Sequence, residues 1–174
     1  MMLGPHPSRQ QTAVDRGIVA LLSSVIFFAC AFSAVKRPTI PAERLVSQDF
    51  SGETRKVFAA AKVAARSMGF DVPYGDQKSG LITTSTLVVS IEPNCDCGTW
   101  NNDPITGHSD LKLTIRIQEI DVDHSRVGVE ATYNVKFTGR NRYGQVTREE
   151  FYRCRSLGRK EKEFFAKVNE YLGA

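Results

Sequence analysis

The sequence lacks the short motifs that identify several large classes of enzyme. It contains no HExxH zinc-hydrolase motif, no GxSxG nucleophile elbow, no phosphate-binding P-loop and no GxGxxG dinucleotide-binding turn. Its net charge of +4 is small for a nucleic-acid-binding protein, and Tyr143 and Tyr152 show no interleaved stacking pattern for RNA. We therefore expect a protein that is not an enzyme, needs no cofactor and binds no nucleic acid.

The sequence has a single long apolar run, residues 17–35 (GIVALLSSVIFFACAFSAV). About 19 apolar residues approach the lower length for a membrane-spanning helix and also fit the apolar region of a secretory signal. Arginines before the run are balanced by Lys36 and Arg37 after it, so the positive-inside rule gives no orientation. We expect residues 1–35 to be a signal peptide or membrane anchor.

The end of this run resembles the lipobox of bacterial lipoproteins, where a small residue precedes the cysteine that becomes lipidated. Here Ala29 precedes Cys30. The resemblance implies cleavage before Cys30 and a lipid on its thiol, and Ala31 in the next position implies the outer membrane. Two alternatives remain open, namely an uncleaved inner-membrane anchor and a cleaved, soluble periplasmic protein.

After the run, the pattern of apolar residues indicates one α+β domain. Residues 36–50 hold two prolines and no regular period, which predicts an extended linker. The domain, residues 51–172, begins and ends with amphipathic helices, because apolar residues there recur every three or four positions. Strand-like segments lie between the helices, at residues 70–74, 81–91, 110–120, 126–137 and 146–154.

We therefore predict an antiparallel sheet of four or five strands with both helices packed on one face. The two middle segments, residues 110–120 and 126–137, alternate apolar and polar side chains and should form a hairpin with one wet face. An antiparallel sheet with one apolar face needs that face covered, and the two helices can cover it.

The order of these elements, together with the segments MGFDV and DQKSGLITT, resembles small bacterial envelope lipoproteins. The similarity is to the helix-grip domains of the lipoprotein subunit of the outer-membrane β-barrel assembly machine, over residues 51–172. It implies a place on the periplasmic face of the outer membrane and a protein partner in the envelope, with a function in outer-membrane assembly as one option. The fold alone does not settle function.

The remaining cysteines, Cys95, Cys97 and Cys154, suggest a disulfide, which is the default in an oxidising compartment. We favour a Cys97–Cys154 bond, because Gly98 lets the backbone turn after Cys97, with Cys95 as the substitute partner. One alternative is a zinc site in which His108 joins the three cysteines, although a one-residue gap between ligands is short for zinc. Another is a redox-active thiol pair.

Two surface features suggest contact with a partner. Trp100 is the single tryptophan and lies in a polar loop, where it can anchor a protein partner. Arg140 and Arg142 belong to a run of cations in the C-terminal third that can meet an acidic protein or anionic lipid. A small-ligand carrier is the rival function, and it requires an apolar cavity among four core candidates, Phe58, Val135, Phe137 and Phe164.

Overall fold

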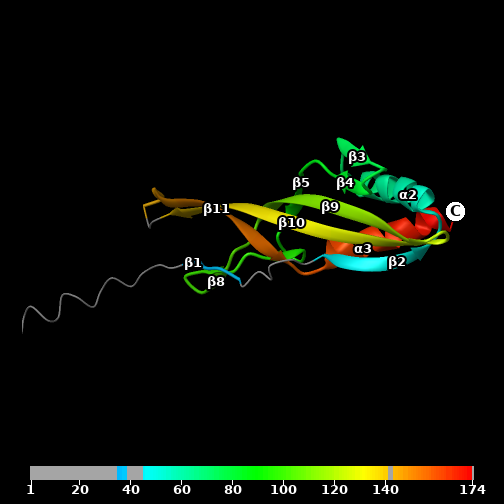
Figure 1. Ribbon diagram of the computed structural model, residues 1–174. Helices are drawn as coiled ribbons and strands as arrows, with labels where there is room; N and C mark the ends of the chain where they lie inside the picture. The colour runs from blue at the N-terminus through cyan, green and yellow to red at the C-terminus, as the bar shows by residue number, and fades with distance from the viewer. Residues whose placement is uncertain (1–34, 39–44, 141–142, 174) are drawn as a thin grey trace, which may run out of the picture. The chain divides into compact units, whose positions relative to one another are not determined.

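The computed structural model describes residues 35–38, 45–140 and 143–173 (Figure 1). The expected leader, with Cys30, lies outside the described residues except for Val35, and so does Arg142. Among the helices of the described part, none has the length and apolarity to cross a membrane. The described residues belong to one compact unit, residues 34–174.

Two long antiparallel strands form the centre of the main sheet. They are β9 (His108–Asp121) and β10 (His124–Arg140), and β10 continues through a turn into β11 (Val146–Ser156). The sheet runs in the order β3-β4-β9-β10-β11-β6. Its shorter members are β3 (Tyr74–Asp76), β4 (Leu81–Thr83) and β6 (Cys95–Asp96), with β2 (Val46–Ser51) added beside β10 and β5 (Leu87–Ser90) beside β9.

A second, smaller sheet has the order β1-β7-β8. It consists of β1 (Val35–Lys36), β7 (Thr99–Trp100) and β8 (Asp103–Pro104). This sheet therefore joins the start of the described chain to the loop that follows the cysteines.

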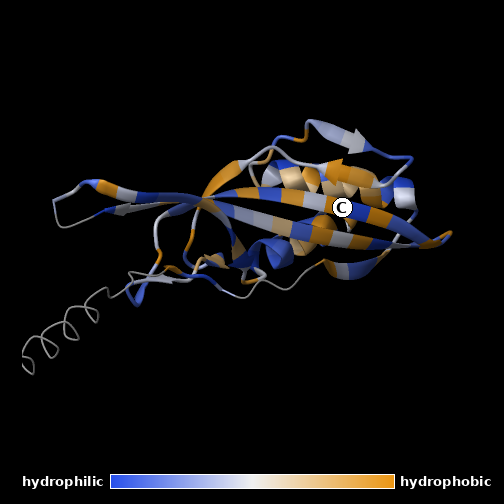
Figure 2. Cartoon of the chain, turned by 60° about the vertical axis from the view of Figure 1, so that its left-hand side comes forward, coloured by the Kyte–Doolittle hydropathy of each residue, from blue (hydrophilic) through white to orange (hydrophobic). Residues whose placement is uncertain are grey.

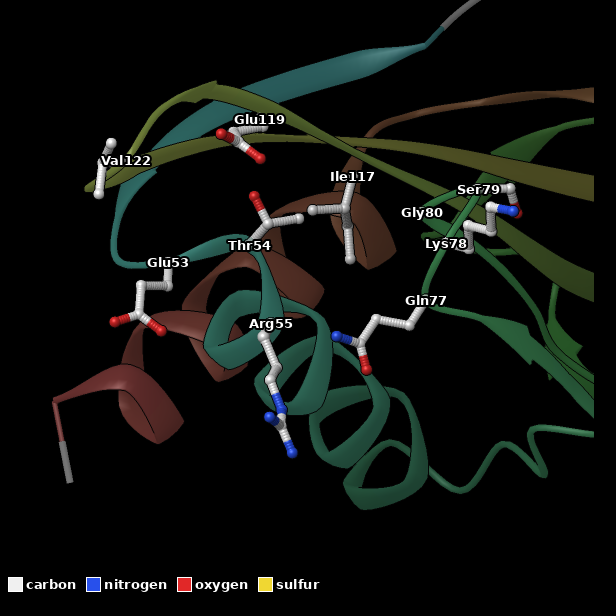
Figure 3. A pocket seen from close by; sticks show the side chains of 10 residues that line it. All are labelled: Glu53, Thr54, Arg55, Gln77, Lys78, Ser79, Gly80, Ile117, Glu119 and Val122. Atoms are coloured by element: carbon white, nitrogen blue, oxygen red, sulfur yellow. The ribbon is translucent and has the colours of Figure 1, made fainter.

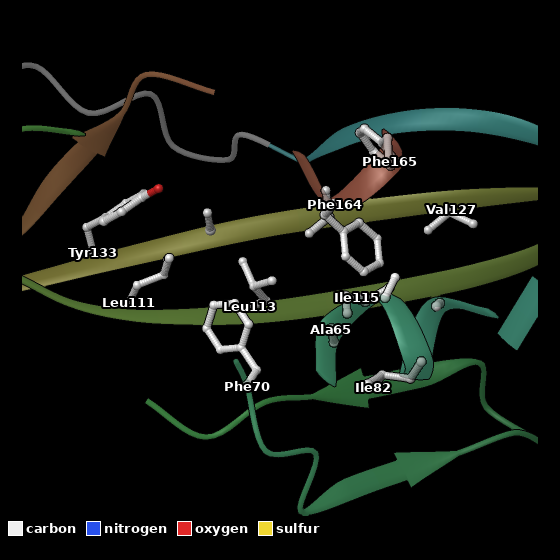
Figure 4. Packing of buried hydrophobic residues seen from close by; sticks show 14 of the residues in the cluster. Ala65, Phe70, Ile82, Leu111, Leu113, Ile115, Val127, Tyr133, Phe164 and Phe165 are labelled. Atoms are coloured by element: carbon white, nitrogen blue, oxygen red, sulfur yellow. The ribbon is translucent and has the colours of Figure 1, made fainter. Parts of the chain in front are cut away.

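Both helices pack on the apolar face of the main sheet, and they contact each other (Figures 1 and 4). Helix α2 (Thr54–Ser67) turns Val57, Ala61 and Ala64 inward, and these small side chains let it lie close to β9. Helix α3 (Arg159–Leu172) contributes Phe164 and other large side chains. Buried and exposed side chains alternate along β9 and β10. The buried ones form the opposite wall of the core and include Leu111, Leu113, Ile115, Val127 and Tyr133.

The α+β class, the two helices and the mainly antiparallel sheet agree with the sequence prediction, but the number of strands was wrong. The described residues contain eleven strands in two sheets, where four or five were expected. The predicted strand over residues 81–91 is divided into two strands, β4 and β5. The strand is interrupted at Thr84, whose hydroxyl takes part in hydrogen bonds with the backbone of Leu113. The strand expected at residues 70–74 begins only at Tyr74.

The expected linker over residues 36–50 was also wrong at both of its ends. Strand β1 includes Lys36, and β2 occupies Val46–Ser51 beside β10. The β2 pairing buries Phe50 against Phe165 of α3, with ring centroids 6.1 Å apart. This contact depends on residues distant in sequence, which is why local periodicity did not reveal the strand.

Candidate functional site

A disulfide joins the turn after β6 to strand β11. The Sγ atoms of Cys97 and Cys154 are bonded at 1.99 Å, and their Cα atoms are 4.5 Å apart. Strand β6 pairs Asp96 with Arg155 and Cys95 with Ser156, so the register leads Cys97 to the position opposite Cys154. This is the pair that the sequence analysis favoured, and it ties the segment carrying Trp100 to the sheet.

Cys95 is the free cysteine of the described chain, and it is buried. Its Sγ lies 3.9 Å from that of Cys97 and 3.7 Å from the hydroxyl of Ser109. Burial raises the pKa of the Cys95 thiol above its usual value, so the neutral thiol is favoured. All three sulfurs lie within 4.8 Å of one another, but the exposed His108 does not belong to this group. The Cys₃His arrangement considered from sequence is therefore not formed in the described chain.

Gly98 turns the chain from the disulfide toward Trp100. Its φ is +83°, and a Cβ built there would lie 2.1 Å from the carbonyl oxygen of Lys36. The turn is fixed by a hydrogen bond from the Gly98 N–H to Oδ1 of Asp96, 2.8 Å long. Only glycine combines this φ with such a close backbone approach. The next residues then pair with β1, with Trp100 opposite Val35.

Trp100 lies half-buried against Phe137 of β10, with ring centroids 5.1 Å apart. The two rings line an open pocket of about 360 Å³. Its other walls come from β8, from the chain that leads into β9 and from β10, namely Asp103, Pro104, Ile105, Thr106, His108, Val135, Lys136 and Thr138. The pocket thus combines an aromatic wall with polar groups at its rim.

Strand β10 continues beside this pocket past the last residues that pair it with β9. The β9–β10 ladder ends at the pair Asn134–Asp110, and among the described strands none pairs with the rest of β10 on that side. Leu113 directs both backbone groups toward Thr84, away from β10. Ala131 is the residue opposite Leu113, so its backbone groups also point away from β9. Because this direction alternates along a strand, the N–H and C=O of Lys136 and Thr138 point to the β9 side, where the pocket lies. They form an open strand edge.

An ion pair and an aromatic contact hold the start of the described chain on the same part of the sheet. Arg37 donates a 2.6 Å hydrogen bond to Glu150, and its guanidinium lies 5.3 Å from the centroid of the Tyr152 ring. Arg37, together with Arg148, lowers the pKa of Glu150. The Tyr152 hydroxyl donates to the carbonyl oxygen of Cys97 at 3.0 Å. These contacts connect β1, the disulfide loop and β11.

Of the three partner-contact residues proposed from sequence, the structure places Trp100 in the pocket. Arg140 lies at the end of β10, where it donates to the carbonyl oxygen of Gly144 at 2.8 Å. Arg142 lies outside the described residues. The open edge of β10 was missed, because the sequence does not show where β9 ends relative to β10.

The four residues that the carrier hypothesis places around one apolar cavity do not all line the same pocket. Phe58 and Phe164 are packed in the core, whereas Val135 and Phe137 line the Trp100 pocket. A separate open pocket of about 500 Å³ lies near the start of α2 (Figure 3). It is lined by polar groups and by charged groups of both signs, including Glu53, Arg55, Lys78 and Glu119. This lining does not match an apolar ligand.

A buried polar group near the disulfide was also missed. Glu161 of α3 is 1% exposed, and its Oε1 accepts a 2.6 Å hydrogen bond from the Ser156 hydroxyl. The Ser156 oxygen in turn accepts from the N–H of Gly158, so this serine organises the start of α3. Burial, with Glu161 and Cys95 nearby, raises the pKa of Tyr133. A glutamate in a charged segment (GRKEKE) gives no sequence signal that it is buried.

Comparison with known proteins assigns no family to the chain. No protein-family model matches it, and no curated protein matches it either.

Proposed function

We propose that this chain is an exported bacterial envelope protein whose domain binds another envelope protein and catalyses no reaction. The apolar run and the lipobox-like Ala29–Cys30 support export and lipidation, with the periplasmic face of the outer membrane as the location. The Cys97–Cys154 disulfide supports an oxidising compartment. Outer-membrane assembly, which the sequence resemblance suggests, is the process we propose for it.

The observation that carries the binding role is the open edge of β10 beside Trp100. Backbone groups of Lys136 and Thr138 face a pocket in which no strand of the described chain pairs with them. An extended peptide can add to such an edge, because main-chain hydrogen bonds supply affinity and a side-chain pocket supplies specificity. The Trp100 and Phe137 rings would receive an apolar side chain of that peptide. The proposed ligand is therefore an extended segment of an envelope protein, added in line with β9.

The experiment uses a photo-crosslinking amino acid at Asp103, an exposed residue of the pocket rim, in the full chain in cells. Thr138→Pro removes one of the two N–H groups that face the open edge and leaves the hydrogen bonds to β11 in place. Thr138→Val is the matched control, because it changes the side chain and retains the N–H. We expect a discrete crosslinked product, identified by mass spectrometry as an envelope protein, with the Thr138→Val chain and not with Thr138→Pro.

Loss of the product in Trp100→Ala would support the same pocket. Disulfide mapping of each variant, showing the Cys97–Cys154 peptide, verifies that the loop is intact. The proposal is wrong if no discrete product forms, or if Thr138→Pro crosslinks as well as Thr138→Val does.

A further inference from the structure

The described domain begins at the end of the sheet that carries the β10–β11 turn. Val35 pairs with Trp100, and the Trp100 ring in turn contacts Phe137 and lies near Gly139. Gly139 is close to the end of β10, where the chain turns toward β11. We call residues 136–153, which form this end, the hairpin end. The chain therefore enters its folded part beside the hairpin end.

The distance from the expected anchor to this point is short. If Cys30 carries the lipid, Val35 is five residues further along the chain, and a fully extended segment of that length spans about 18 Å. If the apolar run stays as an anchor, Val35 is its last residue. The expected linker of residues 36–50 adds no spacing, because Lys36 and Arg37 are already bound to the domain. Either anchor would hold the hairpin end near a membrane surface.

The side chains of the hairpin end suit a membrane surface. Phe151 and Tyr143 are 76% and 71% exposed, and Val146 is exposed as well. Five cationic and two anionic side chains occur among residues 136–153. The amino group of Lys136 lies 5.8 Å from the centroid of the Phe151 ring. Aromatic rings are favoured at the level of lipid headgroups, and cations near them are attracted to anionic lipids.

The opposite end of the sheet has the reverse charge. Val122, in the turn between β9 and β10, is 77% exposed and so resembles Phe151 in exposure. Its neighbours Glu119, Asp121 and Asp123 are acidic, and an anionic surface would repel them. The two ends of the sheet therefore both expose an apolar side chain, but they differ in the charge of the surrounding residues and in their distance along the chain from the expected anchor.

We propose that the hairpin end lies on the lipid headgroups of the membrane that anchors the chain, with Phe151 and Tyr143 at the interface and Lys136 and Arg140 near lipid phosphates. This inference rests on the N-terminal anchoring in the proposed function. The Trp100 pocket would then receive its peptide close to the membrane surface. The partner of this surface is an anionic lipid bilayer.

The test measures the contact of each end with lipid in the full mature chain, reconstituted in vesicles of phosphatidylethanolamine and phosphatidylglycerol. Trp100→Phe removes the single tryptophan and keeps an aromatic ring against Phe137. In that background, Phe151→Trp reports the hairpin end, and Val122→Trp reports the opposite end with matched exposure. Some of the vesicles carry lipids brominated near the headgroup, which quench nearby tryptophan.

We expect Trp at position 151 to lose most of its fluorescence in brominated vesicles and Trp at position 122 to lose little. Equal quenching at both positions, or none at 151 in a chain that floats with the vesicles, overturns the inference and leaves the anchoring intact. A mature chain that does not float overturns both the anchoring and the inference. A further variant, Lys136→Glu with Arg140→Glu, should weaken the quenching at 151, and unchanged quenching would contradict the role of the cations.

Discussion

The half of the sheet under the helices and the hairpin end are stabilised in different ways (Figure 2). Under α2 and α3, side chains such as Ile115, Val127 and Phe164 are fully buried in a continuous apolar core. At the hairpin end and directly beside it, the sheet is held by the Cys97–Cys154 bond, by the Arg37–Glu150 ion pair and by the Trp100–Phe137 contact. The difference indicates that the first region specifies the fold, while the second positions the proposed binding surface and can open locally without global unfolding.

Removal of core volume should produce the largest effect and should be confined to the helix-covered half. Phe164→Ala leaves a cavity in a close-packed core and is expected to lower the free energy of unfolding by about 3–5 kcal/mol. Phe151→Ala is the matched control, because its ring is mostly exposed, and it should change stability by about 0.5 kcal/mol or less. Urea unfolding of both variants makes the measurement. Similar losses for the two variants would contradict the division of the sheet.

Removal of the disulfide should destabilise the hairpin end. The bond links residues separated by 57 positions, so Cys154→Ser is expected to lower stability by about 2–4 kcal/mol. Cys95→Ser is the control, because Cys95 takes no part in a disulfide in the described chain. Hydrogen exchange should show lost protection in β11 and around Trp100, with β9 protected as before. Uniform loss of protection over the sheet would show that the two regions unfold together.

The turn at Gly98 offers a smaller and more local change. Gly98→Ala combines a left-handed φ with a clash at the Lys36 carbonyl oxygen, and positive φ alone costs a non-glycine residue about 1–3 kcal/mol. Gly144→Ala is a close control, since Gly144 has φ +76° and open space around its Cβ position. We expect Gly98→Ala to lower stability and shift Trp100 fluorescence more than Gly144→Ala does. Equal effects would mean that the close approach to β1 is unimportant.

The smallest effect should appear as a pH dependence at the boundary of the two regions. The raised pKa of Tyr133 means that the folded chain keeps its phenol protonated above pH 10, where the unfolded chain loses the proton. Stability that is fully present below pH 10 should therefore decline as the pH rises further. In a Cys95→Ser background, which prevents thiol exchange, Tyr133→Phe should lessen this decline. Urea unfolding at pH 9 and pH 11 measures the slope, and identical slopes would be inconsistent with the buried phenol.

The sequence predicted most where local periodicity was strong. The alternation in residues 110–120 and 126–137 predicted the central hairpin, and the spacing of Val57, Ala61 and Ala64 predicted the first helix. Helix α2 ends at Ser67, and beyond Gly69, whose φ is positive, the N–H of Phe70 donates to the carbonyl oxygen of Ala65.

Prediction failed where pairing with distant residues decides the structure. Strands β1 and β2 lie in a proline-containing segment, and their partners are Trp100 and β10. The proposed binding edge depends on β10 extending past its pairing with β9, which follows from the register and not from composition. The Asp49 carboxylate accepts a 2.7 Å hydrogen bond from Arg126 because β2 lies beside β10, a pairing that local sequence does not indicate. Glu161 is buried because Ser156 supplies a hydrogen bond that no spacing rule indicates.

The most direct test of the account is the intact mass of the mature protein, taken from cell membranes and alkylated without a reductant. We predict a chain that begins at Cys30 and carries acyl groups, with one alkylated thiol, at Cys95, and with Cys97 bonded to Cys154. A chain that begins at Met1 or Met2, with all four cysteines alkylated, would contradict both the export and the covalent bond that holds the hairpin end.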